Sequence, residues 1–130
     1  MKTETKNELT IDEVARKTRN FVKNVRRDVV KQQDVQNNPN ASKYEQRMAL
    51  GEKIATQSAV TALETLLANS KTNAEIVSGV TNLVSGLNAK VVTLAATRKD
   101  PNASKYAKRR ARAEETATTN VVTRLAKLQG

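Results

Sequence analysis

Basic side chains recur along two stretches of this sequence at the spacing of one helix face. The first set, here called the N-terminal stripe, comprises Arg16, Arg19, Lys23, Arg26 and Arg27. The second set, the C-terminal stripe, comprises Lys105, Lys108, Arg109 and Arg112. At about 100° per residue, the N-terminal stripe falls within about 100° of arc. Guanidinium and ammonium groups in such a row form charge-assisted hydrogen bonds with phosphate oxygens, so each stripe predicts a phosphate-binding surface.

The side of the helix opposite the N-terminal stripe is apolar. Its residues are Val14, Phe21, Val22, Val25 and Val29. One stripe alone is as consistent with an ordinary solvated helix face. Two stripes favour phosphate binding, because the chain has 23 Lys and Arg against 13 Asp and Glu, a net charge of +10. Such an excess predicts a polyanionic partner, either nucleic acid or an anionic membrane.

Catalysis finds little support in the composition. The chain of 130 residues contains no His and no Cys. It therefore lacks the usual proton carrier near neutral pH, the thiolate nucleophile and the usual zinc ligands. We expect a protein that is not an enzyme, with no metal, cofactor or small-molecule substrate. We also expect no membrane span, because the longest uncharged run, residues 76–89, is short and contains Gly and Ser.

The sequence is an internal repeat. Pro-Asn-Ala-Ser-Lys-Tyr at 39–44 recurs at 101–106, 62 residues later. Aligning residues 8–68 with residues 70–130 without a gap gives 21 identities in 61 positions. Self-similarity at a fixed offset indicates a duplicated structural unit.

Each unit is predicted to be two helices joined at its Pro turn, since apolar residues recur at helical spacing on both sides. In the first unit, Thr10 and Glu13 predict a capping box at the start of one helix, and Asn40 or Ser42 a cap for the next. In the second unit, helices are expected near 73–97 and 102–128. The fold class is all-α, with four long helices in two tandem αα-hairpins that form a bundle and assemble with other subunits.

This interpretation divides the chain into four segments. They are a polar N-terminal arm at 1–9, the first hairpin at 10–68, a linker at 69–72 and the second hairpin at 73–130. If the four helices alternate up and down around the bundle, the first and fourth are neighbours, and the two basic stripes could join on one side.

The third helix has lost the charges of its counterpart in the first unit. Its apolar positions are kept, but small residues occur at heptad spacing as Ser78-Gly79 and Ser85-Gly86. Small residues let another backbone approach closely. We therefore expect Ser78, Gly79, Ser85 and Gly86 to lie at a subunit interface; the alternative is a neutral, exposed helix.

Tyr44 and Tyr106 occupy equivalent places after the two Pro turns. They can stack on a base or sugar, or wedge the start of a helix against its neighbour, and the second role is the commoner one. With these two tyrosines and Phe21 as its only aromatic residues, the chain is poorly supplied for stacking on single strands. No zinc-finger spacing or phosphate-binding Gly-rich loop is present. Arg and Lys side chains that reach phosphates read no sequence, and no short, isolated recognition helix is seen, so binding to duplex DNA is expected to be independent of sequence.

In architecture, a small basic chain of long helical hairpins with one neutral helix resembles the coat proteins of filamentous and rod-shaped archaeal double-stranded DNA viruses, the rudivirus, lipothrixvirus and tristromavirus group. The resemblance covers the whole chain and involves no local motif. It implies a nucleocapsid protein of the virion, whose subunits wrap duplex DNA inside a helical filament.

The sequence leaves two alternatives open. One is a cytoplasmic, nucleoid-associated or plasmid or phage regulatory protein that binds DNA as a closed dimer. The other is a basic helical adaptor for RNA or for an acidic protein.

Overall fold

Four α-helices make up the computed structural model, which describes the backbone of residues 2–129 and the side chains of residues 11–129. They are α1 (Lys2–Asn37), α2 (Lys43–Asn69), α3 (Asn73–Lys99) and α4 (Lys105–Leu128). No strand occurs in the described residues. The all-α prediction is confirmed.

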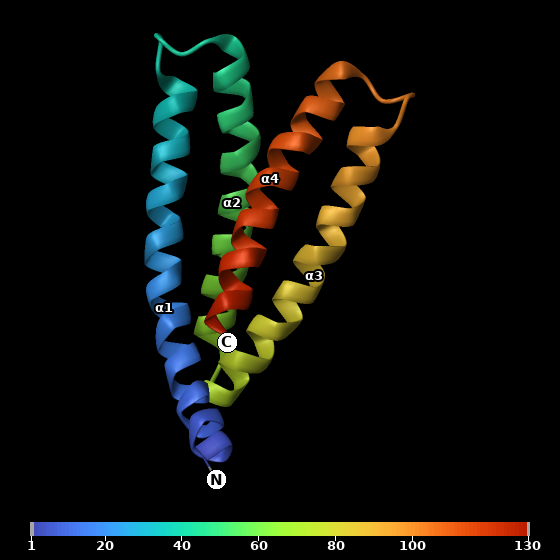
Figure 1. The fold of residues 1–130 in the computed structure, drawn as a ribbon. Helices are drawn as coiled ribbons and strands as arrows, with labels where there is room; N and C mark the ends of the chain where they lie inside the picture. Colours follow the sequence, from blue (N-terminus) through green and yellow to red (C-terminus); the bar gives the residue numbers. More distant parts are fainter. Residues whose placement is uncertain (1, 130) are drawn as a thin grey trace.

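The helices form two antiparallel hairpins, α1 with α2 and α3 with α4 (Figure 1). The hairpins meet at one end, here called the closed end, where the link at 70–72 and both chain termini lie. They diverge toward the other end, the open end, where the two Pro turns lie apart (Figure 1). Along the centre, α2 packs extensively on α4, whereas α1 and α4 touch at few points. The bundle is therefore two hairpins joined through α2 and α4.

Side-chain caps explain where three of the helices begin. Ser42 accepts a hydrogen bond from the Glu45 backbone N–H at 3.0 Å, and the Glu45 carboxylate accepts one from the Ser42 N–H, which completes a capping box. Ser104 caps α4 by accepting a hydrogen bond from the Ala107 backbone N–H, without the reciprocal bond, and Thr72 caps α3 by accepting one from the Glu75 N–H. Each cap satisfies a backbone donor that the first turn leaves free.

The start of α1 differs from the prediction. The helix begins at Lys2, so residues 2–9 are its first turns and the backbone at Thr10 is already helical. The predicted cap at Thr10 is therefore wrong, although its counterpart Thr72 does cap α3. The physical reason is that residues 2–9 contain no Pro or Gly, and extending an existing helix costs far less than starting one.

The repeat is visible in the packing of α2 on α4. Seven residues of each helix are buried, and the two sets match one for one at the offset of 62. In α2 they are Ala49, Gly51, Ala55, Thr56, Ala59, Val60 and Leu63; in α4 they are Ala111, Ala113, Ala117, Thr118, Val121, Val122 and Leu125. Gly51 faces its own counterpart, because a Cβ added there would lie 2.7 Å from the Cβ of Ala113. Equivalent positions thus meet across an approximate two-fold axis between the helices.

The hydrophobic core fills the space between these helices and α1. Its buried members are Ala15, Phe21, Val22, Val25, Val29, Ala59, Val60, Leu63, Ile76, Val80, Val121 and Leu125. Full burial of one such Val, Leu, Ile or Phe side chain contributes about 1.5–3 kcal/mol, so this cluster is the main source of stability. Only Ile76 and Val80 of the cluster come from α3.

Candidate nucleic-acid interface

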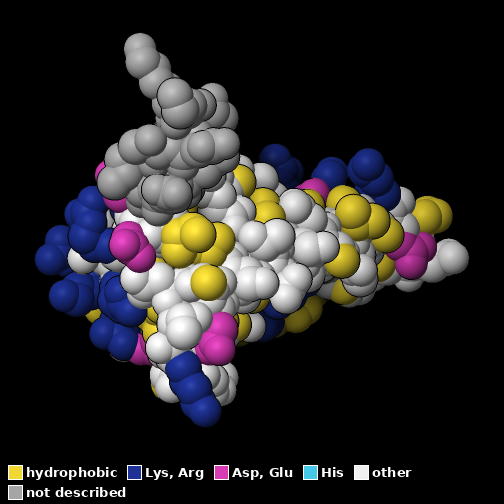
Figure 2. Space-filling view, turned by 90° about the horizontal axis from the view of Figure 1, so that it is seen from below, with side chains coloured by type: hydrophobic (Ala, Val, Ile, Leu, Met, Phe, Trp, Pro, Cys, Tyr) yellow, Lys and Arg dark blue, Asp and Glu magenta, His cyan; other side chains and the backbone are white. Residues whose placement is uncertain are grey.

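The N-terminal stripe lies on the exposed side of α1. All five of its side chains are exposed, and the five apolar residues predicted on the opposite side are buried. Figure 2, which views the closed end, shows Lys and Arg side chains gathered on the side where α1 lies in Figure 1. The predicted division of α1 into a core face and a basic face is confirmed.

Three cations of this stripe have no acidic partner among the side chains of residues 11–129. Arg26 forms an ion pair with Glu64 of α2, and Arg19 donates a hydrogen bond to Asn73 at 3.4 Å. Within the described part, no carboxylate lies within 4.0 Å of Arg16, Lys23 or Arg27. These three side chains can therefore bind an external anion without first breaking an ion pair.

The C-terminal stripe begins at the first turn of α4. Lys105, Arg109 and Arg112 are exposed, and Lys108 is partly buried. Beside it, Arg98 of α3 donates two hydrogen bonds to Glu115, at 2.6 and 3.4 Å. The hydrogen bonds to Glu115 and the charge of this carboxylate raise the pKa of Arg98. Because Arg98 is paired with Glu115, it adds no free charge to the stripe.

The structure does not bring the two stripes together. Arg124 of α4 forms an ion pair with Asp28 of α1 at 2.6 Å, so these two residues lie at the same level along the bundle axis. Arg112 precedes Arg124 by twelve residues, about 18 Å toward the open end at 1.5 Å per residue. Arg27 adjoins Asp28, and the rest of its stripe extends toward the closed end. The expectation that the stripes join fails because α4 packs mainly on α3 and α2 and touches α1 at few points.

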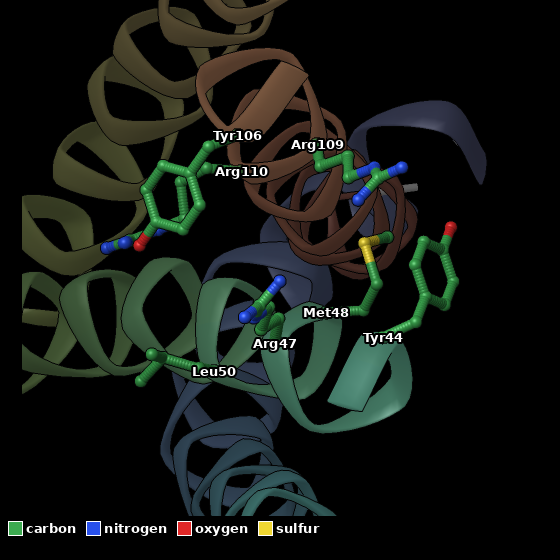
Figure 3. A pocket seen from close by; sticks show the side chains of 7 residues that line it. All are labelled: Tyr44, Arg47, Met48, Leu50, Tyr106, Arg109 and Arg110. Atoms are coloured by element: carbon green, nitrogen blue, oxygen red, sulfur yellow. The ribbon is translucent and has the colours of Figure 1, made fainter. Parts of the chain in front are cut away.

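A cleft between α2 and α4 near the open end contains Arg47 and Arg110, which belong to neither stripe. Its lining consists of Tyr44, Arg47, Met48, Leu50, Tyr106, Arg109 and Arg110 (Figure 3). The guanidinium carbon of Arg109 lies 5.9 Å from the ring centre of Tyr44. Arg110 approaches Glu114 at 3.1 Å on its own helix.

The repeat itself carries the signal that would have found this cleft. Arg47 and Arg109 stand 62 residues apart, as do Tyr44 and Tyr106. The two tyrosines are 51% and 59% exposed, so neither ring is wedged deep between helices as the commoner alternative required. Because α2 and α4 pack with equivalent positions facing each other, the retained residues beside this contact, Tyr44 with Tyr106 and Arg47 with Arg109, line one cleft.

The four small residues of α3 do not share one environment. A Cβ at Gly79 would overlap the side chain of Leu66, so this glycine admits close packing of α2 within the same chain. The expectation that Gly79 lies at a subunit interface is therefore corrected, because its close neighbour is Leu66 of the same chain. Gly86 has nothing within 4 Å of the equivalent point, and Ser78 and Ser85 are exposed.

Beyond Val80, α3 is only half covered. Leu83, Val84, Leu87 and Val91 are partly buried, and Val92 is 70% exposed. The apolar side of α3 thus faces solvent along much of its length, because α3 leans away from α1 toward the open end (Figure 1). A single chain therefore does not cover this part of α3, and its contact with another subunit stays a prediction.

No group of three acidic residues in the described part could hold a metal ion, and none of the described helices is long and apolar enough to cross a membrane. Comparison with protein-family models, with curated proteins and with solved structures finds no match to this chain. The fold and surfaces define a class, an all-α duplicated hairpin protein with separated basic surfaces.

Proposed function

We propose that this chain is a structural protein that binds duplex DNA through the phosphate backbone, without sequence preference, and coats it in many copies. The observation that supports it most is the N-terminal stripe, where Arg16, Lys23 and Arg27 are exposed and unpaired within the described residues. The buried opposite side of α1 holds the row in place.

The dimensions of the stripe suit a DNA backbone. From Arg16 to Arg27 the helix rises about 16 Å at 1.5 Å per residue. Duplex DNA carries one negative charge per about 1.7 Å of its axis, so several phosphates lie within reach of one stripe. Contacts of this kind release counterions and carry no sequence information, which makes binding steeply dependent on salt.

Assembly along the DNA would use α3. Two copies of a chain with net charge +10 repel each other through their basic surfaces. The uncharged run at 76–89 and the half-exposed apolar residues around Leu87 offer a surface where a second copy is not repelled. The equivalent residues of α1, Phe21, Val22 and Val25, are buried within the chain. A second copy packed on α3 would bury the apolar residues of α3 in the same way.

These two surfaces together suit a coat protein of the kind implied by the architectural resemblance to filamentous archaeal viruses. The basic side would face the genome, and α3 would face the neighbouring subunit. The place of such a protein is the virion.

The test is binding to linear duplex DNA of several lengths across a salt series. We expect cooperative coverage that grows with DNA length. The variant Arg16→Gln/Lys23→Gln/Arg27→Gln should reduce the slope of log affinity against log salt by about 2.7, which is three contacts at about 0.9 each. The matched control Lys53→Gln/Lys71→Gln/Lys127→Gln removes the same charge away from the stripe and should keep most of the slope.

Two results would count against the proposal. Binding that saturates at one short site indicates a regulatory or nucleoid dimer instead. Absence of binding at low salt rejects DNA as the partner and leaves an acidic protein or RNA.

A further inference from the structure

The cleft near the open end combines charge and aromatic surface from both repeat units. It encloses about 80 Å³ of free volume between the first turns of α2 and α4. Figure 3 shows Tyr44 and Tyr106 on opposite sides, with Arg47 and Met48 of α2 between them and Arg109 near Tyr44. A ligand entering the cleft therefore meets both units.

The positive charge of the cleft is largely uncompensated. No carboxylate of residues 11–129 lies within 4.0 Å of the Arg47 or Arg109 guanidinium. Arg110 adds a third guanidinium, paired with Glu114. The acidic residue nearest in sequence to Arg47, Glu45, is engaged in the capping box of α2. Guanidinium forks match phosphate oxygens in geometry and charge, so an anion with several oxygens suits this lining.

Folding alone does not account for the residues that the two units share here. Lys, Tyr and Arg recur as Lys43, Tyr44 and Arg47 and as Lys105, Tyr106 and Arg109. All six are exposed. Ser42 and Ser104 recur because they cap helices, but the exposed Tyr and Arg side chains bury little surface and cap nothing. The exposed basic residues of α1, by contrast, have no counterparts in α3.

We propose that this cleft is a second phosphate-binding site, built jointly by the two repeat units, in which Arg47 and Arg109 hold phosphate oxygens between the two tyrosine rings. Its phosphate comes from the DNA backbone or from a free polyphosphate. That the phosphate belongs to DNA rests on the proposed function. In that case each subunit contacts the DNA phosphates at two places, the cleft and the N-terminal stripe.

The chain supplies its own reporter for this site. It contains no Trp, and its only two Tyr residues both line the cleft. Tyrosine fluorescence therefore reports on the cleft alone. Titration with sodium tripolyphosphate, at ionic strength held constant with NaCl, should give a saturable change in this fluorescence. Tyr44→Phe and Tyr106→Phe should each remove part of the signal.

The decisive variant is Arg47→Gln/Arg109→Gln, compared with Lys53→Gln/Lys71→Gln as a control of equal charge. In the first, we expect tripolyphosphate binding to weaken at least tenfold and duplex DNA binding, measured by anisotropy of a labelled duplex, to weaken about tenfold. The control should change neither by more than twofold. Circular dichroism checks that the variants stay helical, as expected for exposed positions.

The outcomes separate the site from the proposed function. A fluorescence signal that is absent, or equal in the Arg47→Gln/Arg109→Gln variant, overturns the site even if the native protein binds DNA. Tripolyphosphate binding in the cleft without any binding of duplex DNA supports the phosphate site, assigns its phosphate to a free ligand and rejects the proposed function.

Discussion

α1 and α3 occupy equivalent places in the two repeat units, yet they end in different environments. Both keep apolar residues at the same register, so that Val14, Phe21 and Val25 correspond to Ile76, Leu83 and Leu87. In α1 all three are buried; in α3 only Ile76 is. The other side of α1 is basic, and that of α3 is neutral.

The comparison shows that a duplicated pattern fixes which side of a helix is apolar but not how completely it is covered. Coverage depends on how far the two hairpins diverge. At the closed end they are in contact, and Ile76 and Val80 enter the common core. Toward the open end α3 leans away, and the same pattern is left half exposed (Figure 1). Of the two equivalent helices, α3, which lacks the basic residues of α1, is thus the one whose apolar side stays partly exposed.

Truncating equivalent residues should give the largest contrast. Phe21→Ala removes a buried ring that also packs under the Arg124 guanidinium, whose carbon lies 4.9 Å from the ring centre. The loss of unfolding free energy is expected to be about 3–5 kcal/mol. Leu83→Ala, at the equivalent but half-exposed position, should cost about 1 kcal/mol. Urea unfolding of dilute protein measures both. Equal losses would mean that α3 is as well packed as α1.

Giving α3 the charges of α1 should separate assembly from folding. Ser85→Lys/Asn88→Arg/Ala89→Arg places at exposed positions the residues that α1 has at Lys23, Arg26 and Arg27. Stability should change by no more than about 0.5 kcal/mol, as is usual for exposed sites. Self-association, measured by sedimentation, and cooperativity on DNA should fall at least tenfold, because the α3 surfaces then repel.

A matched control adds three charges on α4, as Thr119→Lys/Thr123→Lys/Ala126→Arg, where all three positions are exposed. It should associate as the native chain does. If the α3 variant also assembles normally, α3 is not the surface between copies.

Helix-breaking prolines and helix-capping serines in the sequence predict most of the helix bounds. Pro39, Pro101 and the serines that follow fix the starts of α2 and α4 to within a few residues, since a proline stops one helix and a serine caps the next. The start of α1 escaped prediction because nothing in residues 2–9 stops a helix.

The candidate sites were predictable only where one helix carries them. The N-terminal stripe follows from periodicity, and its exposure is confirmed. Gly79 was assigned to a subunit contact because its actual neighbour, Leu66, lies on another helix and is not visible from spacing. Arg47 was passed over because its importance comes from α2 lying against α4, and the packing of two helices is not encoded in the register of either one.

The smallest expected effect compares Glu52 with its counterpart Glu114. Burial raises the pKa of Glu52, which lines a groove with Asp28, Lys31 and Arg124, so its charged form is disfavoured in the folded chain. The folded protein then binds this proton more tightly than the unfolded one. Below the ordinary Glu value of 4.5 both states are protonated and the penalty is absent. As pH rises above that value, the unfolded state ionises first, and stability declines.

Glu52→Gln should therefore raise the unfolding free energy at pH 7 by less than about 1 kcal/mol and leave it unchanged near pH 4. Glu114 instead lies 3.1 Å from Arg110, with both side chains largely covered. Glu114→Gln removes that ion pair and should lower stability at pH 7 by about 0.5 kcal/mol. Opposite signs at equivalent positions would show that each unit sets its own electrostatics despite a shared core. A loss of stability in both variants at pH 7 would mean that the Glu52 carboxylate is stabilised by its groove instead of being penalised there.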